Sequence, residues 1–176
     1  VMHIGGCAAA TACDSCIYFG REFNRPKLYP FDLKELNRTD YVKFSQKMKP
    51  YISPRIRGVH KLEWYVEGFG KYLNDIGESI EMEAFSGNHS YPEAKELVRN
   101  QIDRGYPLPC LMLQHQDRVQ FKDFIWHWFL VVGYREQGDD LMISIDTYGQ
   151  KTVYKLKQLW KTGHEEKGGF IRYVSL

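Results

Sequence analysis

The chain has 176 residues, of which 43% are hydrophobic and 15% aromatic, and its formal net charge is +2 at pH 7. This length and composition predict a single folded domain with a substantial hydrophobic core, and they exclude a disordered chain. The near balance of 24 basic and 22 acidic residues gives no electrostatic case for nucleic-acid binding, and no apolar run is long enough to span a membrane. The short basic groups at residues 55–57 and 151–161 are interpreted as solvated faces.

The chain begins Val1-Met2 without the charged and apolar regions of a signal peptide, which indicates an excerpt or a processed product. The sequence therefore leaves the compartment open between secreted, cell-surface and cytoplasmic locations, and it leaves the oligomeric state open. Four cysteines, at positions 7, 13, 16 and 110, are too few and too unevenly spaced for a disulfide framework. At least some of them are predicted to be free thiols.

The first predicted helix covers residues 7–19, where alanine and other small side chains dominate, and Gly20 is expected to cap it. Cys7 would then stand at the amino end of this helix. Unpaired backbone N–H groups and the helix dipole favour a thiolate over a thiol at such a position.

Four prolines interrupt residues 20–60, which are predicted to be loops around short helical pieces near 33–36 and 41–48. Apolar residues at helical spacing predict an amphipathic helix over 61–73, weakened by Gly68 and Gly70. Alternating apolar and acidic residues at 80–84 predict a short strand with one face in water.

The segment that starts at Ser90 matches a capping box and predicts a helix that stops at Gly105. Residues 107–113 are apolar on both faces, which is typical of a central strand. Two strands joined by a turn follow at 125–134 and up to Asp146. A strand at 152–154, a short helix or turn near 156–160 and a last strand around 170–174 complete the chain. Helices followed by mostly antiparallel strands indicate the α+β class.

His127 lies near the start of one strand, and Asp146 lies at the end of the next. Strand alternation predicts that His127, Phe129 and Val131 share one face. A carboxylate that accepts the imidazole N–H fixes the ring tautomer and leaves the other nitrogen for a nucleophile. Each residue alone is more simply explained as a satisfied core histidine and a turn cap. The pair, together with a cysteine at a helix start, favours a catalytic hypothesis.

Cys7 is the predicted nucleophile, although an inert buried thiol is the alternative interpretation. Gly5 and Gly6 would let a substrate backbone approach the sulfur closely. Cys13 and Cys16 have the spacing of a redox or zinc pair, but they fall inside the helix and no second pair completes a metal site. They are interpreted as structural thiols, and no metal or cofactor is predicted.

Several motifs resemble the papain-like C39 group of cysteine peptidases. These motifs are Gly6-Cys7-Ala8 with its alanine-rich helix, the helix-to-strand unit at 93–113, the run from His127-Trp128 to Gly133-Tyr134, and Asp146-Thr147-Tyr148-Gly149. They occur in the family's order over most of the chain, and the likeness is weakest at residues 20–60. The resemblance implies one papain-like domain over 1–176, with a helical half at about 1–105 and an antiparallel sheet half at about 106–176.

Carried over by position, the resemblance implies that Cys7 is the nucleophile, His127 the general base and then acid, and Asp146 the orienting carboxylate. Two features depart from the family pattern. Ala8 stands where such enzymes usually have glycine. The upstream positions that usually hold an oxyanion-hole glutamine are occupied by Val1, Met2 and His3. Loss of one oxyanion donor typically costs ~100- to 1,000-fold in rate.

The predicted function is a thiol hydrolase that cleaves peptide or isopeptide bonds in a peptide or protein substrate through a Cys7 acyl-enzyme. Acyl transfer and deamidation use the same three groups and stay open. A catalytically weak or silent papain-like module that binds peptide is the alternative from another class. A domain that docks on a larger polypeptide is a third.

Overall fold

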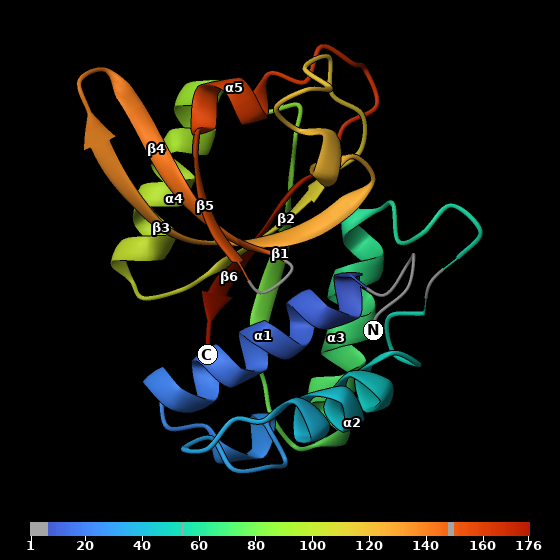
Figure 1. The fold of residues 1–176 in the computed structure, drawn as a ribbon. Helices are drawn as coiled ribbons and strands as arrows, with labels where there is room; N and C mark the ends of the chain where they lie inside the picture. Colours follow the sequence, from blue (N-terminus) through green and yellow to red (C-terminus); the bar gives the residue numbers. More distant parts are fainter. Residues whose placement is uncertain (1–6, 54, 148–149) are drawn as a thin grey trace.

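The computed structural model describes residues 7–53, 55–147 and 150–176, without the side chains of Cys7 and Thr147. In the described chain, helices alternate irregularly with six strands that form one antiparallel sheet of order β1-β6-β2-β3-β4-β5 (Figure 1). The helices are α1 (Cys7–Glu22), α2 (Arg38–Met48), α3 (Leu62–Asp75), α4 (Tyr91–Asp103) and α5 (Leu156–Trp160), with 3-10 turns η1 (Pro26–Leu28) and η2 (Lys122–Phe124). The strands are β1 (Glu81–Ser86), β2 (Leu108–Met112), β3 (His127–Gln137), β4 (Asp140–Thr147), β5 (Gln150–Lys155) and β6 (Gly169–Ser175). The predicted α+β class is confirmed.

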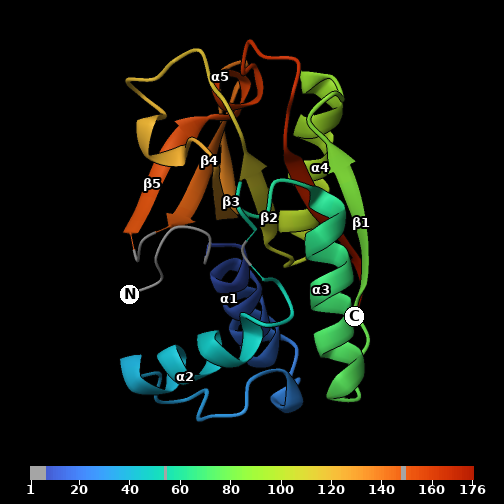
Figure 2. The ribbon, with the colours of Figure 1, turned by 90° about the vertical axis from the view of Figure 1, so that its right-hand side faces the viewer.

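The sheet separates two hydrophobic clusters. On one face Leu111 and Trp128 pack with α1, α2 and α3, and on the other face Cys110 and Phe129 pack with α4 and α5. Neighbouring residues of one strand enter opposite clusters because successive side chains of a strand point to opposite faces. Figure 2 shows the helical layer of α1, α2 and α3 below and beside the sheet, and α1 packs against β3.

Most predicted elements form close to their expected bounds. Ser90 accepts a hydrogen bond from the Glu93 backbone N–H while the Glu93 carboxylate accepts one from the Ser90 backbone N–H, so α4 begins with the predicted capping box. Every residue of β2 is buried, which confirms it as a central strand. β1 lies before residue 105, in the segment that was predicted to be the helical half, but it pairs with β6. The sheet therefore includes one strand from that segment.

Two local predictions were wrong. The first helix continues past Gly20 to Glu22, and Asn24 adopts the left-handed conformation (φ 53°) that ends many helices. Gly20 instead lets the following loop approach, because an added Cβ would lie 2.9 Å from a Leu33 methyl carbon. Residues 33–36 form no helix; the Asp32 carboxylate accepts a hydrogen bond from the Lys34 N–H (2.8 Å), a turn that competes with helix formation.

The two glycines of α3 differ in their surroundings, and we expect opposite effects on stability when each is replaced by alanine. A Cβ at Gly68 would collide with the Tyr51 carbonyl oxygen, whereas a Cβ at Gly70 would meet nothing within 4 Å. Gly70→Ala should raise the free energy of unfolding by about 1 kcal/mol through helix propensity. Gly68→Ala should lower it by about 1–3 kcal/mol through overpacking. Urea unfolding of the two variants tests this, and equal effects would contradict the assigned contact.

Candidate functional site

The candidate nucleophile stands where the sequence predicted, at the first residue of a helix. α1 begins at Cys7, and its side chain lies outside the described residues. The predicted contributions of Gly5 and Gly6, and the oxyanion-hole position at His3, also lie outside the described residues.

His127 is the first residue of β3 and is 7% exposed. In the register it lies opposite Met112 of β2, and its ring centroid is 6.4 Å from that of Phe124 and 6.3 Å from that of Phe129. The preceding residue, Trp126, has a φ of 52°, a left-handed conformation that costs a residue with a side chain roughly 1–2 kcal/mol. Such strain persists where surrounding contacts impose it, and it is common at functional sites.

The buried position of His127 lowers its pKa to about 4, because the charged imidazolium loses its hydration. The Asp123 carboxylate, in η2, opposes this effect and raises the pKa. The ring is therefore neutral at pH 7, the form that accepts a proton from a nucleophile, although the lowered pKa makes it a weaker base than an ordinary histidine. Asp123 was missed in the sequence, although its position four residues before His127 in a polar segment was the available signal.

The strand register separates Asp146 from His127. Residues 137 and 140 pair across a two-residue turn, and a bulge near Gly133 shifts the pairing by one, so that Asp146 lies opposite Leu130. Leu130 is three positions further along β3 than His127, or about 10 Å at the usual strand rise. Alternation also assigns Asp146 to the sheet face of Leu130 and Trp128, whereas the His127 ring lies near Phe129 on the other face.

Asp146 instead lies near a carboxyl group that sequence reasoning had not assigned. Asp14 of α1 accepts a hydrogen bond from the Tyr41 hydroxyl (2.8 Å). Burial raises the pKa of Asp14 to about 7, the Tyr41 hydrogen bond partly opposes this, and the charge of Asp146 adds to the rise. The signal in the sequence was the spacing: Asp14 follows the helix start at Cys7 by seven residues, which is about two turns.

The other cysteines have the character of structural thiols. Cys13 and Cys16 are fully buried in α1, and burial raises the pKa of both thiols well above the ordinary value. Within residues 7–53, 55–147 and 150–176, no three or more His, Cys, Asp and Glu side chains are grouped so that they could hold a metal ion. In that part of the chain, moreover, no helix has the length and apolar character that a membrane span requires.

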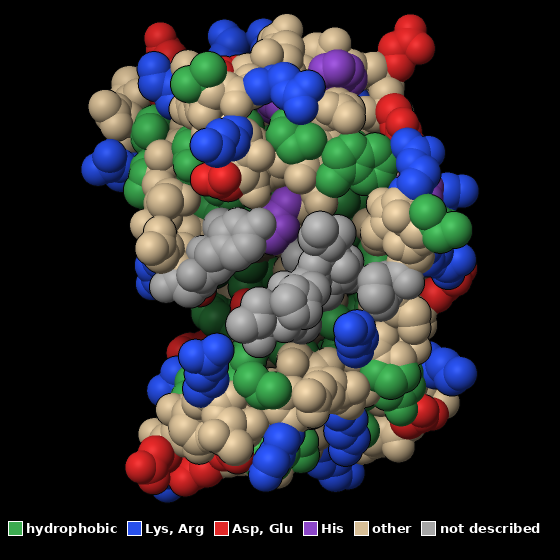
Figure 3. Space-filling model, turned by 45° about the vertical axis from the view of Figure 1, so that its right-hand side comes forward, with side chains coloured by type: hydrophobic (Ala, Val, Ile, Leu, Met, Phe, Trp, Pro, Cys, Tyr) green, Lys and Arg blue, Asp and Glu red, His purple; other side chains and the backbone are tan. Residues whose placement is uncertain are grey.

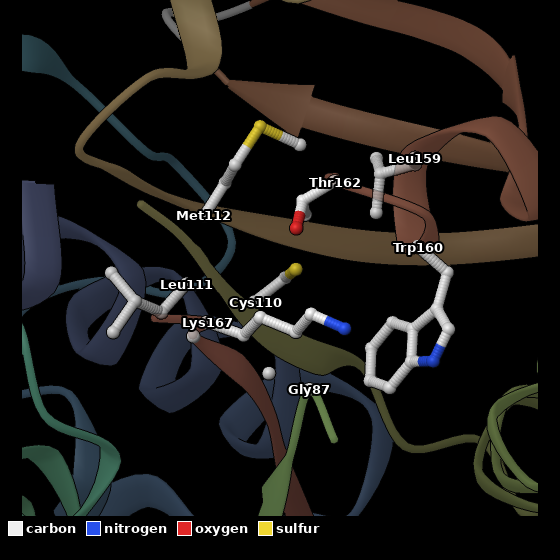
Figure 4. A pocket seen from close by; sticks show the side chains of 10 residues that line it. Gly87, Cys110, Leu111, Met112, Leu159, Trp160, Thr162 and Lys167 are labelled. Atoms are coloured by element: carbon white, nitrogen blue, oxygen red, sulfur yellow. The ribbon is translucent and has the colours of Figure 1, made fainter. Parts of the chain in front are cut away.

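Figure 4 shows a small cavity next to Cys110, on the sheet face that packs against α5. Its volume of about 20 Å³ is enough for about one water molecule. Cys110 and Thr162 point toward each other, and Lys167 extends toward Trp160. Burial raises the pKa of the Cys110 thiol, so this cysteine is a poor nucleophile.

A larger hollow of about 450 Å³ lies between α5 and the loop after β2. Its lining is polar and includes Lys157 and Lys161 together with Asp117 and Asp140. Neither His127 nor Asp146 lines either space. His127 and Asp146 are thus separate from both.

Comparison with known proteins finds no family model that matches the chain and no curated protein or solved structure with significant similarity to it.

Proposed function

We propose that this chain is a papain-like cysteine peptidase that cleaves peptide or isopeptide bonds through an acyl-enzyme on Cys7. One observation carries the proposal: the helix that begins at Cys7 packs against the strand that begins with the buried histidine His127. A helix amino end stabilises a thiolate, and a neutral imidazole can accept the thiol proton. In the described residues, that helix and that strand pack against each other.

In the proposed reaction, His127 removes the proton of the Cys7 thiol, and the sulfur attacks the substrate carbonyl carbon. The imidazolium then gives its proton to the leaving amine as the carbon–nitrogen bond breaks. Water, deprotonated by the same imidazole, hydrolyses the thioester and restores the thiol. The backbone N–H of Cys7 would supply one oxyanion donor.

The role of the carboxylates differs from the one that the family resemblance implies. The register puts Asp146 about 10 Å along the sheet from His127, whereas Asp123 acts on the electrostatics of the ring. We therefore propose that Asp123 stabilises the charged imidazolium of His127. The charge of Asp146 acts instead on Asp14, whose pKa it raises. Asp123 is exposed, so its contribution is modest and weakens as salt is added.

The offset of Asp146 favours a second candidate function, a module of the same fold that binds peptide with little turnover. An orienting carboxylate fixes the histidine tautomer, and an enzyme without one is slow. Peptide binding that persists in Cys7→Ser, in a parent protein with no measurable hydrolysis, would support this alternative.

Selective alkylation tests the proposed peptidase. Iodoacetamide at pH 7 should modify Cys7 at least ~10-fold faster than Cys13, Cys16 or Cys110, because the latter three are buried thiols with raised pKa values. Peptide mapping by mass spectrometry after timed quenching measures the four rates. Cys7→Ser is the control and should leave the slow labelling of the others unchanged. Similar slow rates at all four cysteines would overturn the proposal.

A further inference from the structure

Two guanidinium groups from the loop before α3 cover two indole rings, one in α3 and one at the residue before β3. The guanidinium carbon of Arg55 lies 3.7 Å from the ring centroid of Trp64, and that of Arg57 lies 4.9 Å from that of Trp126. His60 meets both indoles edge-on, with centroids 4.8 and 5.9 Å away. We call Arg55, Arg57, His60, Lys61, Trp64 and Trp126 the arginine–tryptophan surface.

Contacts with the sheet hold this surface in place. The buried indole N–H of Trp128 donates to the carbonyl oxygen of Val59 (2.7 Å), which fixes the loop on β3. The backbone N–H of Trp126 donates to the Leu113 carbonyl (2.9 Å) while its φ stays at 52°. The loop and the tryptophan are thus both anchored to the same end of the sheet. Figure 3 shows Lys and Arg side chains spread over this face of the molecule, with hydrophobic, Asp and Glu side chains among those on its right-hand side.

We propose that the arginine–tryptophan surface binds an acidic peptide segment. A guanidinium stacked on an indole keeps its N–H edge free, and that edge matches a carboxylate with two parallel hydrogen bonds. Lys61 adds a third cation, 5.5 Å from the Trp64 ring. Glu166 comes within 3.8 Å of Arg57, but both side chains are 59% exposed, so this ion pair is weak and a ligand carboxylate can replace it. Ile56 is fully exposed and offers an apolar contact beside the cations.

The same observations favour a peptide over nucleic acid. Single strands stack their bases on free aromatic faces, but here guanidinium groups already cover the indoles. Phosphate backbones also need an extended basic face, whereas this surface has three cations in a chain of net charge +2. A short segment with two or three carboxylates fits the number of charges better.

Trp126 directly precedes His127, so a peptide bound to this surface lies beside the candidate base. This step rests on the proposed function: the enzyme would prefer substrates with acidic residues on one side of the bond that is cleaved. Binding itself does not depend on turnover. The two claims are therefore tested separately.

Fluorescence anisotropy with a labelled peptide rich in Asp and Glu tests the binding, with a Lys-substituted peptide of the same length as the comparison. In about 0.05 M salt, where screening is weak, the acidic peptide should bind at least ~10-fold more tightly than the basic one. The double variant Arg55→Gln/Arg57→Gln should weaken binding roughly 10-fold. Arg55→Lys/Arg57→Lys keeps the positive charges but not the planar guanidinium groups, so it should bind the acidic peptide more tightly than the Gln variant and less tightly than the parent protein.

The matched control is Lys157→Gln/Lys161→Gln, which removes the same charge from the hollow beside α5 and should leave binding unchanged. The proposal would be overturned if the two peptides bound with equal affinity, or if Lys157→Gln/Lys161→Gln weakened binding as much as Arg55→Gln/Arg57→Gln. It would also be overturned if Arg55→Lys/Arg57→Lys bound as tightly as the parent protein. Tighter binding of a single-stranded oligonucleotide of the same charge would also overturn it. Thermal melting confirms that each variant is folded. If the acidic peptide binds but Cys7 is not alkylated selectively, the binding proposal holds and the peptidase proposal fails. If Cys7 is alkylated selectively but the acidic peptide does not bind, the peptidase proposal holds and the binding proposal fails.

Discussion

We expect iodoacetamide to alkylate Cys7 about 100-fold more slowly at pH 7 in His127→Ala than in the parent protein, the lower end of what a positioned general base contributes. The reason is the neutral imidazole, which takes the thiol proton as the sulfur attacks. Rates measured by mass spectrometry as a function of pH carry more information than one value. In the parent protein the rate should fall as the pH drops through about 4, where His127 becomes protonated.

Two carboxylate variants decide which acid assists this histidine. Asp123→Asn removes the charge that raises the pKa of His127, so the acidic limb of the rate profile should move to lower pH. Asp146→Asn should leave that limb in place, because its carboxylate acts on Asp14 and Tyr41. The opposite pattern would restore Asp146 as the orienting residue. A parent profile that lacks the limb and rises only near the pKa of an ordinary thiol would reject His127 as the base.

Asp14→Asn should stabilise the protein at pH 8 by roughly 2 kcal/mol relative to its effect at pH 4. A rise in pKa from 3.8 to about 7 corresponds to about 4 kcal/mol at most, and the partial exposure of Asp14 reduces it. The carbonyl oxygen of the substituted amide still accepts the Tyr41 hydrogen bond, but no charge is buried. Asp75→Asn is the matched control, because Tyr51 donates an equivalent hydrogen bond to an exposed Asp75 carboxylate (2.7 Å). It should change stability by less than about 0.5 kcal/mol.

The pH dependence follows from two opposed groups. The Asp14 carboxyl keeps its proton up to about pH 7 when folded and loses it near 3.8 when unfolded, so its effect lowers stability as the pH rises through that range. His127 is protonated below about 6.5 when unfolded but only below about 4 when folded, so its effect raises stability as the pH rises from 4 to 6.5. The two slopes nearly cancel in the parent protein. Urea unfolding of Asp14→Asn should expose the rising slope of His127, and a flat profile would contradict the assignment.

Local patterns in the sequence were sufficient for most of the fold. The capping box at Ser90, the apolar run of β2 and the alternation in β3 each depend on neighbouring residues, and the structure confirms them. The loop at 33–36 was mispredicted because an Asp32 side-chain hydrogen bond competes with the helix there. Gly20 looked like a cap because sequence does not reveal which loop will approach it.

The site was less predictable because it depends on register and tertiary contacts. Alternation correctly separated the two faces of β3, but it does not tell which residue of β4 lies opposite which residue of β3, and the bulge near Gly133 shifts the pairing. The arginine–tryptophan surface was also not predicted, because it too depends on contacts between residues far apart in the sequence. Arg55 and Arg57 had been interpreted as part of a solvated face, and the rings that they cover come from residues 64 and 126.

Three consecutive residues, the last before β3 and its first two, have three separate tasks. Trp126 belongs to the binding surface, His127 is the candidate base, and Trp128 anchors the loop through Val59. A deletion within this triplet would disturb all three at once, because alternation would exchange their faces. The loop that carries the arginines is free of that constraint. Natural variants should therefore diversify ligand preference through residues 55–58, while the strand beneath changes little.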